Sequence, residues 1–331
     1  MTNLAPIRIG VIGAAAIVPN ALTNPARNVS EVQIIAIAAR DPKRAEKFAR
    51  KHHIPRVHKT YDDLIADPEI DAIYNPLPNS LHAEWTIRAL RAGKHVLCEK
   101  PFSSNASEAI EMANAAKETG KVLSEAFAYR HHPLTARMKE VMTGGGLGKI
   151  KSIEARFCFL LPVLSNIRFR YELAGGALMD AGCYPLSLVC FLMDAEPEVV
   201  RAKAKLIRPD VDSRMEADIK FPNGVDARVV CDMLSPRLFD SVLTVKGDAG
   251  EMKVMSPFQP HWLHWLTLRT SKEKQSGRIK GGDIYALQLR AFADTIHSGT
   301  PLNTNPDDAV KNMRVIDAIY EKAGLTVRGR R

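Results

Sequence analysis

Several features that mark special classes of protein are missing from this sequence. The chain of 331 residues has only five cysteines, an odd number without a Cys-x-x-Cys pair, so reduced thiols in a cytoplasmic protein are expected rather than a disulfide framework. No apolar run approaches the length needed to span a bilayer, and residues 1–8 lack the pattern of a signal peptide. Neither secretion nor a membrane partner is therefore expected.

A dense basic surface is missing as well. The net charge is +9, but the basic residues are scattered along the chain. The one dense cluster, Arg328 to Arg331, lies at a C-terminus that we expect to be frayed. Nucleic-acid binding would need lysines and arginines gathered on one face. The charge therefore argues against a nucleic-acid partner, although the same positive field would favour an anionic small ligand.

What the first half of the chain does contain is a regular alternation of short apolar segments and helical ones. Strands are expected at residues 7–12, 33–38, 57–58, 71–74, 94–98 and 122–125, and helices at 43–53, 61–66, 80–92 and 107–118. Strands separated by helices of this length predict a parallel sheet with right-handed crossovers. Residues 1–128 are therefore expected to form a doubly wound α/β domain of the Rossmann type.

The first expected strand ends in a glycine turn, followed by a helical stretch toward Asn28. A strand, a tight turn and a helix N-terminus form a pyrophosphate site, because free backbone N–H groups and the helix dipole face the anion. The pattern here is degenerate, since Gly13 holds the first glycine position while Ala15 and Val18 hold the second and third. The residues of this turn that we expect to bind a dinucleotide are Gly13, Ala15, Ala16 and Ile17.

The second expected strand ends in Ala39-Arg40-Asp41-Pro42. An acidic residue at this position grips the ribose hydroxyls of NAD, whereas a small residue followed by arginine leaves room for the 2′-phosphate of NADP. Asp41 could argue for NAD, but before a proline it is better explained as the N-cap of the next helix. NADP is therefore favoured over NAD. The alternative for Arg40 is an exposed arginine at a helix start.

The strand at residues 94–98 ends in Glu99-Lys100-Pro101, because proline cannot continue a central strand. Lys100 then lies at the carboxyl end of a buried strand, where ligands and reactive groups collect in open α/β sheets. A catalytic lysine is expected here; the alternative is a surface lysine beside a turn. The other residues expected near the cofactor are Leu77, Asn79 and His82 in the loop 75–82, Glu99, and Lys100 itself.

From residue 149 the pattern changes to long alternating stretches, which predict a mostly antiparallel sheet in residues 129–331 with one face free for another subunit. Pro222-Asn223-Gly224 is expected to join two strands as a hairpin. Residues 271–282 are interpreted as a polar, mobile loop. His261 and His264 would point to opposite faces of an expected strand, so no metal site is predicted.

A helix is expected to follow the glycine-rich stretch that begins at Gly175. Asp180 suits its N-cap or first turn, and Tyr184, four residues on, would lie on the same face. A carboxylate, a phenol and Lys100 together could handle the proton of an alcohol; the alternative is that Asp180 only caps the helix and Tyr184 belongs to the core. Arg168 and Arg170 could contact cofactor or substrate, or be solvated.

These motifs resemble the Gfo/Idh/MocA oxidoreductase family, the group of glucose–fructose oxidoreductase, inositol dehydrogenase and the rhizopine-catabolism proteins. The resemblance covers nearly the whole chain and rests on the turn at residues 10–13, on Cys98-Glu99-Lys100-Pro101, on Glu125-Ala126 with Arg130 and Pro133, and on residues 175–180. Within the family, Ala39-Arg40-Asp41 and the Asp180/Tyr184 pair are similar to the dimeric dihydrodiol dehydrogenase and NADP-linked sugar dehydrogenase branch. Many relatives carry histidine at the position of Tyr184.

The resemblance implies a Rossmann domain, a C-terminal domain with a large open sheet that packs against another subunit in dimers or tetramers, and a cis Lys100–Pro101 bond. It also implies reversible hydride transfer between NADP(H) and a hydroxyl or carbonyl carbon of a sugar-like or cyclic polyol substrate. Tyr184 would be the general acid/base, Lys100 would lower the pKa of that phenol or hydrogen-bond the substrate oxygen, and Asp180 would orient the pair.

Two other functions stay open at this point. Some members of the family cleave glycosidic bonds by a transient oxidation with tightly held NAD; Arg40 argues against this mechanism because such enzymes need no 2′-phosphate. The chain could also be a non-catalytic sensor of NADP. The presence of Lys100, Asp180 and Tyr184 together argues against a sensor.

Overall fold

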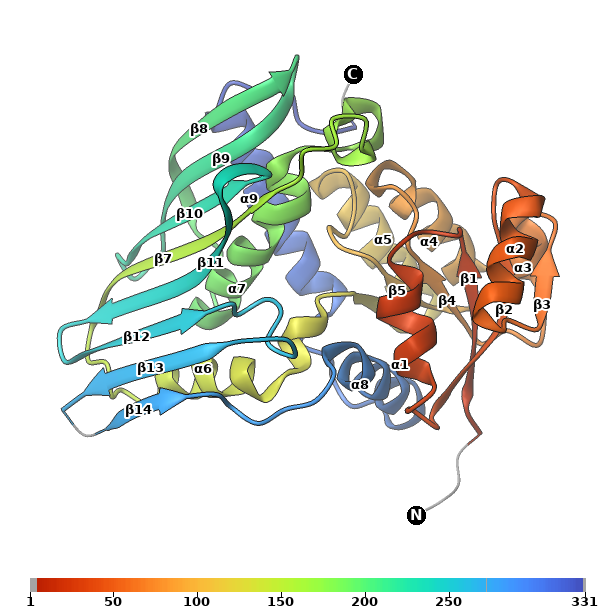
Figure 1. The fold of residues 1–331 in the computed structure, drawn as a ribbon, viewed down its shortest axis with the longest axis horizontal. Helices are drawn as coiled ribbons and strands as arrows, with labels where there is room; N and C mark the ends of the chain where they lie inside the picture. The colour runs from red at the N-terminus through yellow and green to blue at the C-terminus, as the bar shows by residue number, and fades with distance from the viewer. Residues whose placement is uncertain (1–4, 272, 330–331) are drawn as a thin grey trace. The chain divides into compact units, whose positions relative to one another are not determined.

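The computed structural model describes residues 5–271 and 273–329. The chain forms two compact units (Figure 1). Unit 1 contains the chain up to residue 128 together with residues 283–310, and unit 2 contains residues 129–282 and those from 311 on. The division expected at residue 128 coincides with the end of the first stretch. Residues 283–310 differ from the expectation, because the apolar face of the helix Ile284–Ser298 packs into the core of unit 1.

Unit 1 is built on a six-stranded sheet with the strand order β3-β2-β1-β4-β5-β6, in which every neighbouring pair is parallel. The strands are β1 (Ile7–Ile12), β2 (Val32–Ala38), β3 (Arg56–His58), β4 (Ala72–Asn75), β5 (His95–Cys98) and β6 (Leu123–Glu125). Because the strand order reverses between β1 and β4, the carboxyl ends of these strands meet at a switch point. The predicted Rossmann-type sheet is confirmed.

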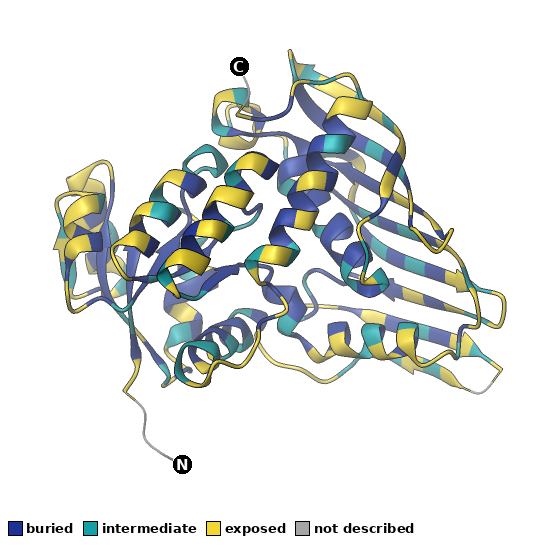
Figure 2. Ribbon diagram, turned by 180° about the vertical axis from the view of Figure 1, so that it is seen from behind, coloured by how far each residue is buried: buried dark blue, intermediate teal, exposed yellow. Residues whose placement is uncertain are grey.

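The longer helices of the chain show exposed residues on one side and buried residues on the other (Figure 2). The helices of unit 1 are α1 (Asn24–Ala26), α2 (Pro42–His52), α3 (Tyr61–Ala66), α4 (His82–Arg91), α5 (Ala106–Thr119) and α8 (Ile284–Ser298). The Asp41 carboxylate accepts from the Lys43 N–H and caps α2, as predicted. The helical stretch expected after the glycine turn is present: a π-turn at Pro19–Thr23 leads directly into α1, and prolines lie in the first turn of each.

Unit 2 is built on an eight-stranded sheet with the order β14-β13-β12-β11-β7-β10-β9-β8, antiparallel except for the parallel pair β7 and β10. The strands are β7 (Ile150–Leu160), β8 (Glu198–Arg208), β9 (Val211–Lys220), β10 (Asp226–Asp232), β11 (Leu234–Gly247), β12 (Gly250–Met255), β13 (Trp265–Thr270) and β14 (Lys274–Gly277). The antiparallel sheet and the β9–β10 hairpin are confirmed.

Two expectations for this region are corrected. The segment 271–282 is not simply a loop, since it contributes β14, which pairs with β13; residue 272 lies outside the described residues. His261 and His264 do not lie on a strand, because β13 begins only at Trp265. His264 is instead buried, with its Nδ1 2.7 Å from the Pro260 carbonyl oxygen and its Nε2 accepting from the Ile279 N–H.

Unit 2 also contains α6 (Pro133–Thr143), short helical turns at Ile167–Phe169 and Tyr171–Leu173, a π-turn at Leu178–Gly182 that runs into α7 (Cys183–Met193), and α9 (Pro306–Lys322) from residue 311 on. By length and hydropathy the stretch Tyr171–Met193 is long and apolar enough to cross a membrane, contrary to the expectation that no apolar run approaches this length. Its most apolar part is 78% buried, as in the core helix of a globular unit. The stretch carries Asp180 and Tyr184.

Candidate active site

The turn after β1 has the geometry of a phosphate-binding loop despite its missing glycines. Gly13 has φ = +103°, and a Cβ atom at this position would lie 2.9 Å from Cδ2 of Leu77. The Gly13 N–H donates to the Ala38 carbonyl, which fixes the turn to the end of β2. Ala15, Ala16 and Ile17 are exposed or half-buried, and the side chains of Ala15 and Ile17 pack against the hydrophobic core of unit 1. Only a glycine fits the first position, and the turn as formed suits a dinucleotide.

Two guanidinium groups accompany this turn. Arg40 follows the end of β2 and is exposed, and Arg44 donates from Nη2 to the Ala14 carbonyl oxygen at 2.7 Å. Within residues 5–271 and 273–329 neither arginine forms an ion pair. Tyr61 lies beside both; burial raises the pKa of its phenol, and their positive charges oppose that shift. Two cations without a carboxylate partner at a dinucleotide turn suit an additional phosphate.

Arg44 was not identified from the sequence, although a signal was present. It lies in the first turn of α2, where the helix dipole disfavours a cation. A basic residue in this position is easier to explain when an anion binds beside it. Tyr61 gave no comparable signal, since a tyrosine at the start of a short helix is an ordinary core residue.

Lys100 follows the buried end of β5 and is half-buried, as expected, and its bond to Pro101 is cis. The neighbouring Glu99 accepts a 2.5 Å hydrogen bond from the Tyr74 hydroxyl and one from the Lys100 backbone N–H. Tyr285 of α8 also lies here: burial raises the pKa of its phenol to about 12, with Glu99 adding to the shift and Lys100 opposing it. Lys100 therefore has a carboxylate and two phenols in its surroundings, and neither tyrosine was predicted.

The loop between β4 and α4 is held together from inside. The ring of His82 is fully buried, with Nδ1 2.9 Å from the Pro101 carbonyl oxygen and Nε2 2.8 Å from that of Leu77. Burial lowers the pKa of His82 to about 4, so the ring is neutral near pH 7 and its single N–H donates to one of these two carbonyls at a time. We therefore assign His82 the role of tying the Leu77 loop to the turn after Lys100, while Asn79, at the start of a short helical turn, remains half-buried beside it.

In unit 2, Arg168 joins the predicted pair. Its Nε lies 2.8 Å from Oδ2 of Asp180, whose side chain is only 15% exposed. The negative charge of Asp180 is the main cause that raises the pKa of Arg168, and Tyr184 adds to it. Of the two positions expected for Asp180, the structure has the first turn and not the N-cap, since the residue lies inside the π-turn and donates its own N–H to the Gly176 carbonyl. Arg168 is thus part of a charged group with Asp180 and is not simply solvated.

The ring of Tyr184 stands in an aromatic cluster. Its centroid lies 5.2 Å from that of Phe157, 5.7 Å from Phe258 and 6.0 Å from Tyr129. Tyr129 donates its hydroxyl to Ser187 on the next turn of α7, so it supports the helix. These contacts fix the ring while the residue stays half-buried. A phenol whose ring is fixed by packing presents its hydroxyl group in a defined position.

The predicted residues thus form two groups. In unit 1 they follow the carboxyl ends of four parallel strands: the turn 13–17 after β1, Arg40 after β2, Leu77, Asn79 and His82 after β4, and Glu99 and Lys100 after β5. In unit 2 Asp180 and Tyr184 lie on one helical stretch, with Arg168 bonded to the first. The first group can bind a dinucleotide and contribute an amine; the second offers a phenol and an ion pair.

Comparisons with known proteins agree with this division. Residues 7–127 match the model of the Gfo/Idh/MocA oxidoreductase family with an NAD-binding Rossmann fold, and residues 135–253 match the C-terminal domain model of the same family. The chain is 34% identical over 95% of its length, and 96% of the relative's, to D-xylose 1-dehydrogenase (NADP(+)) 2 of Haloferax volcanii. It is 32% identical over 69% of its length, and 68% of the relative's, to trans-1,2-dihydrobenzene-1,2-diol dehydrogenase of Sus scrofa.

Among solved structures, a 3-ketoreductase from Actinomadura kijaniata in complex with NADP and TDP-benzene superposes with a TM-score of 0.87 at 29% identity. The superposition covers 96% of this chain and 98% of that one. The resemblance inferred from the motifs is therefore confirmed over nearly the whole length. The chain belongs to the Gfo/Idh/MocA oxidoreductase family and is an oxidoreductase.

Proposed function

We propose that this oxidoreductase transfers a hydride reversibly between NADP(H) and a hydroxyl or carbonyl carbon of a sugar-like or cyclic polyol substrate. The observation that carries the proposal is the half-buried Lys100 at the carboxyl end of β5, on the same sheet as a dinucleotide turn. A half-buried amine at this edge of the sheet lies where ligands bind in such folds, and there it can donate a hydrogen bond or a proton to a substrate oxygen. A lysine without a role in ligand binding would be expected in solvent. The relatives are dehydrogenases and reductases of sugars and of a cyclic diol.

The residues that would hold the cofactor are those of the turn and its surroundings. The turn at Gly13 to Ile17 would bind the pyrophosphate, and Arg40 with Arg44 would bind the 2′-phosphate. Leu77, Asn79 and Glu99 would contact the ribose and nicotinamide, with His82 holding the loop. When bound, the nicotinamide supplies the hydride chemistry; the chain supplies position and proton handling. The naming of NADP in the xylose dehydrogenase and in the ketoreductase complex supports NADP here too.

Proton transfer is assigned to Tyr184 and Lys100 acting on one substrate oxygen. The phenol of Tyr184 would be the general acid/base, and the ammonium of Lys100 would stabilise the phenolate or donate to the oxygen directly. Asp180, paired with Arg168, would orient the phenol without leaving an uncompensated negative charge beside it. The turnover rates of Tyr184→Phe and Lys100→Met, measured separately, distinguish which of the two groups transfers the proton.

Sugars are the favoured substrate class because the named substrates of the full-length relatives are a pentose and a dTDP-linked deoxyhexose. The segments 159–171 and 236–239, which we assign to the substrate pocket, carry exposed apolar side chains, namely Val163, Leu164, Ile167, Leu238 and Phe239. Aromatic and aliphatic surfaces of this kind contact the apolar face of a sugar ring or the base of a sugar nucleotide. We propose a free or nucleotide-linked sugar as the substrate.

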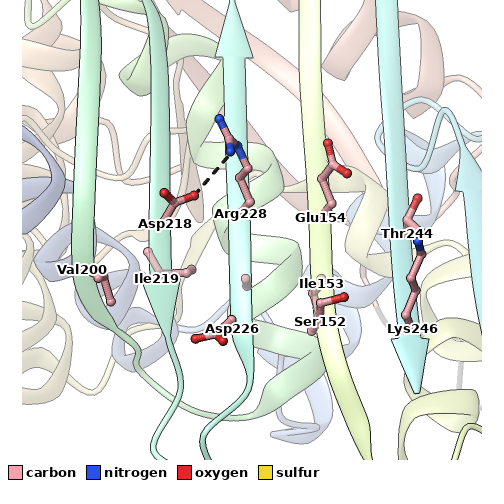
Figure 3. A pocket seen from close by; sticks show the side chains of 11 residues that line it. Ser152, Ile153, Glu154, Val200, Asp218, Ile219, Asp226, Arg228, Thr244 and Lys246 are labelled. Atoms are coloured by element: carbon pink, nitrogen blue, oxygen red, sulfur yellow. Dashed lines mark ion pairs between the residues drawn. The ribbon is translucent and has the colours of Figure 1, made fainter. Parts of the chain in front are cut away.

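We also propose that copies of the chain associate through the free face of the unit 2 sheet. Side chains of both signs alternate across it, as in the ion pair between Arg228 and Asp218, and they line a shallow depression with Glu154 and Lys246 (Figure 3). A face with both charges complements itself in a two-fold contact.

The five cysteines are buried, which suits the cytoplasmic location that we propose.

The proposal is tested by following NADPH and NADP⁺ absorbance with a panel of aldoses, cyclic polyols and keto sugars. Turnover of at least one member is expected. Lys100→Met should then lower turnover by about 10²–10⁴, the usual contribution of an acid–base group. Lys117→Met, which removes an exposed lysine of α5, is the matched control and should leave turnover unchanged. Turnover within tenfold of the unmodified protein in Lys100→Met would contradict the proposal.

A further inference from the structure

The helical stretch that carries Asp180 and Tyr184 has no cap of its own. Neither the π-turn Leu178–Gly182 nor α7 receives a side-chain hydrogen bond from its preceding residue. The N–H of Leu178, at the first position of the stretch, instead donates to Oδ2 of Asp212 at 2.7 Å. Asp212 belongs to β9, so the cap of this stretch comes from a distant strand. A carboxylate at a helix N-terminus satisfies an otherwise orphaned donor and complements the helix dipole.

Asp212 is itself held in place by the C-terminal part of the chain. Arg328 donates from Nη2 to Oδ1 of Asp212 at 2.9 Å, and the Tyr320 hydroxyl donates to the same oxygen at 3.0 Å. The side chains of Asp212 and Arg328 are both 0% exposed. The guanidinium lies 4.2 Å from the ring centroid of Tyr320. The expectation that Arg328 belongs to a frayed terminus is therefore wrong. Arg330 and Arg331 lie outside the described residues.

The same arginine reaches the glycine turn before the helical stretch. Its Nε donates to the Gly175 carbonyl at 2.7 Å. Gly176 has φ = +139°, and a Cβ there would come within 2.8 Å of Nη2 of Arg328. The Gly176 N–H in turn donates to the Arg168 carbonyl. One buried guanidinium thus connects the helix cap with the turn that holds the backbone of Arg168, the ion-pair partner of Asp180.

We propose that Asp212, Tyr320 and Arg328 form a positioning cluster for Asp180 and Tyr184. All three side chains are buried, so the cluster acts through the backbone and fixes where the helical stretch begins, two residues before Asp180. A change in that start would move the Tyr184 phenol relative to the substrate oxygen, and a displacement of about 1 Å can cost about 10²-fold in rate. The inference rests on the proposed role of Tyr184 in proton transfer.

The test combines variants of the cluster with Tyr184→Phe. Arg328→Met should lower kcat by about 10- to 100-fold while the dissociation constant for NADPH, measured by fluorescence, stays within about twofold. Arg328→Lys, which keeps the charge for Asp212, should recover part of the loss. Arg201→Met removes an exposed ion pair with Asp218 on the same strand β9 and is the control, with kcat unchanged. In a Tyr184→Phe background Arg328→Met should cost less than about twofold in single-turnover rate.

The outcomes separate the inference from the function it rests on. An unchanged kcat in folded Arg328→Met, or an equal loss in both backgrounds, overturns the positioning role and leaves the function intact. Full turnover in Tyr184→Phe alone overturns the proposed function instead. If Arg328→Met does not fold, Tyr320→Phe takes its place, because it removes only one hydrogen bond to Asp212. Its kcat and its NADPH affinity are then compared with those of the unmodified protein. A lower kcat with unchanged NADPH affinity in Tyr320→Phe supports the inference; an unchanged kcat contradicts it.

Discussion

The two groups of candidate residues are built in opposite ways. In unit 1 each residue lies within a few positions of the strand end that places it, so local chain geometry alone brings Gly13, Arg40 and Lys100 to one edge of the sheet. In unit 2 the stretch with Asp180 and Tyr184 depends on partners 34 and 153 residues away in the chain, Asp212 for Leu178 and Arg328 for Gly175. The candidate residues of unit 1 are therefore specified locally, and those of unit 2 by long-range contacts.

The largest expected effect concerns the proton-transfer side. Tyr184→Phe should lower turnover by about 10²–10⁴ because the variant keeps the ring and its packing but loses the proton. Tyr129→Phe is the matched control: it removes a phenolic hydroxyl in the same aromatic cluster that bonds Ser187. Steady-state kinetics should show a small effect there. Equal losses in both variants would mean that the cluster acts through packing and not through the Tyr184 hydroxyl.

A smaller effect is expected from the charge beside Tyr184. Arg168→Gln removes a cation and leaves the Asp180 carboxylate uncompensated, and both changes disfavour a phenolate. The apparent pKa on the basic side of the pH–rate profile should therefore rise. Arg170→Gln, which loses an exposed pairing with Glu172, is the control and should leave the profile in place. A lower apparent pKa in Arg168→Gln would show that the arginine does not act electrostatically on the Tyr184 phenol.

The buried His82 predicts how stability depends on pH on the cofactor side. Its pKa is about 4 in the folded chain and about 6.5 when unfolded, so below pH 6.5 the unfolded state binds more protons. The free energy of unfolding should therefore fall by about 2 kcal/mol between pH 7 and pH 5 from this group alone. Urea unfolding of His82→Asn should show a shallower fall with pH. An equally steep fall in the variant would assign the dependence to other histidines.

The smallest effect is expected on the exposed face of the unit 2 sheet. Arg201 pairs with Asp218 at 2.8 Å, but its side chain is 65% exposed. Arg201→Met should change the free energy of unfolding by less than about 1 kcal/mol, whereas breaking the buried Asp212–Arg328 pair should cost about 3–5 kcal/mol. Denaturant titration of both variants measures the contrast. Similar losses in the free energy of unfolding would contradict the expectation that the buried ion pair contributes more to stability than the exposed one.

The sequence was sufficient for the parts of the fold with strong local signals. The strand–helix alternation of unit 1, the Asp41 cap before Pro42 and the Lys100 strand end were all predicted and found, since each depends on residues within a few positions of one another. The alternating pattern also predicted the mostly antiparallel sheet of unit 2, although β14 was missed because it is a short strand of polar residues and glycine.

What could not be predicted depends on contacts between distant segments. Nothing local marks Arg328 as buried, because an arginine three residues from the end of a chain is ordinarily solvated. Asp212 resembles any polar residue at a strand start, and its role as a helix cap needs the three-dimensional structure. The return of α8 to unit 1 was missed for the same reason, since its apolar face could pack on either unit.

The most direct test of the account is a fluorescence titration of cofactor-free protein with NADPH and with NADH, repeated for Arg40→Ala, Arg44→Ala and the control Arg50→Ala on the same helix. The account predicts that the unmodified protein prefers NADPH. Each of the first two variants should weaken NADPH binding by about 10- to 100-fold, the loss expected for a charged hydrogen bond, and leave NADH binding unchanged. Equal binding of both cofactors, untouched by either variant, would contradict the assignment of this turn and its arginines to NADP.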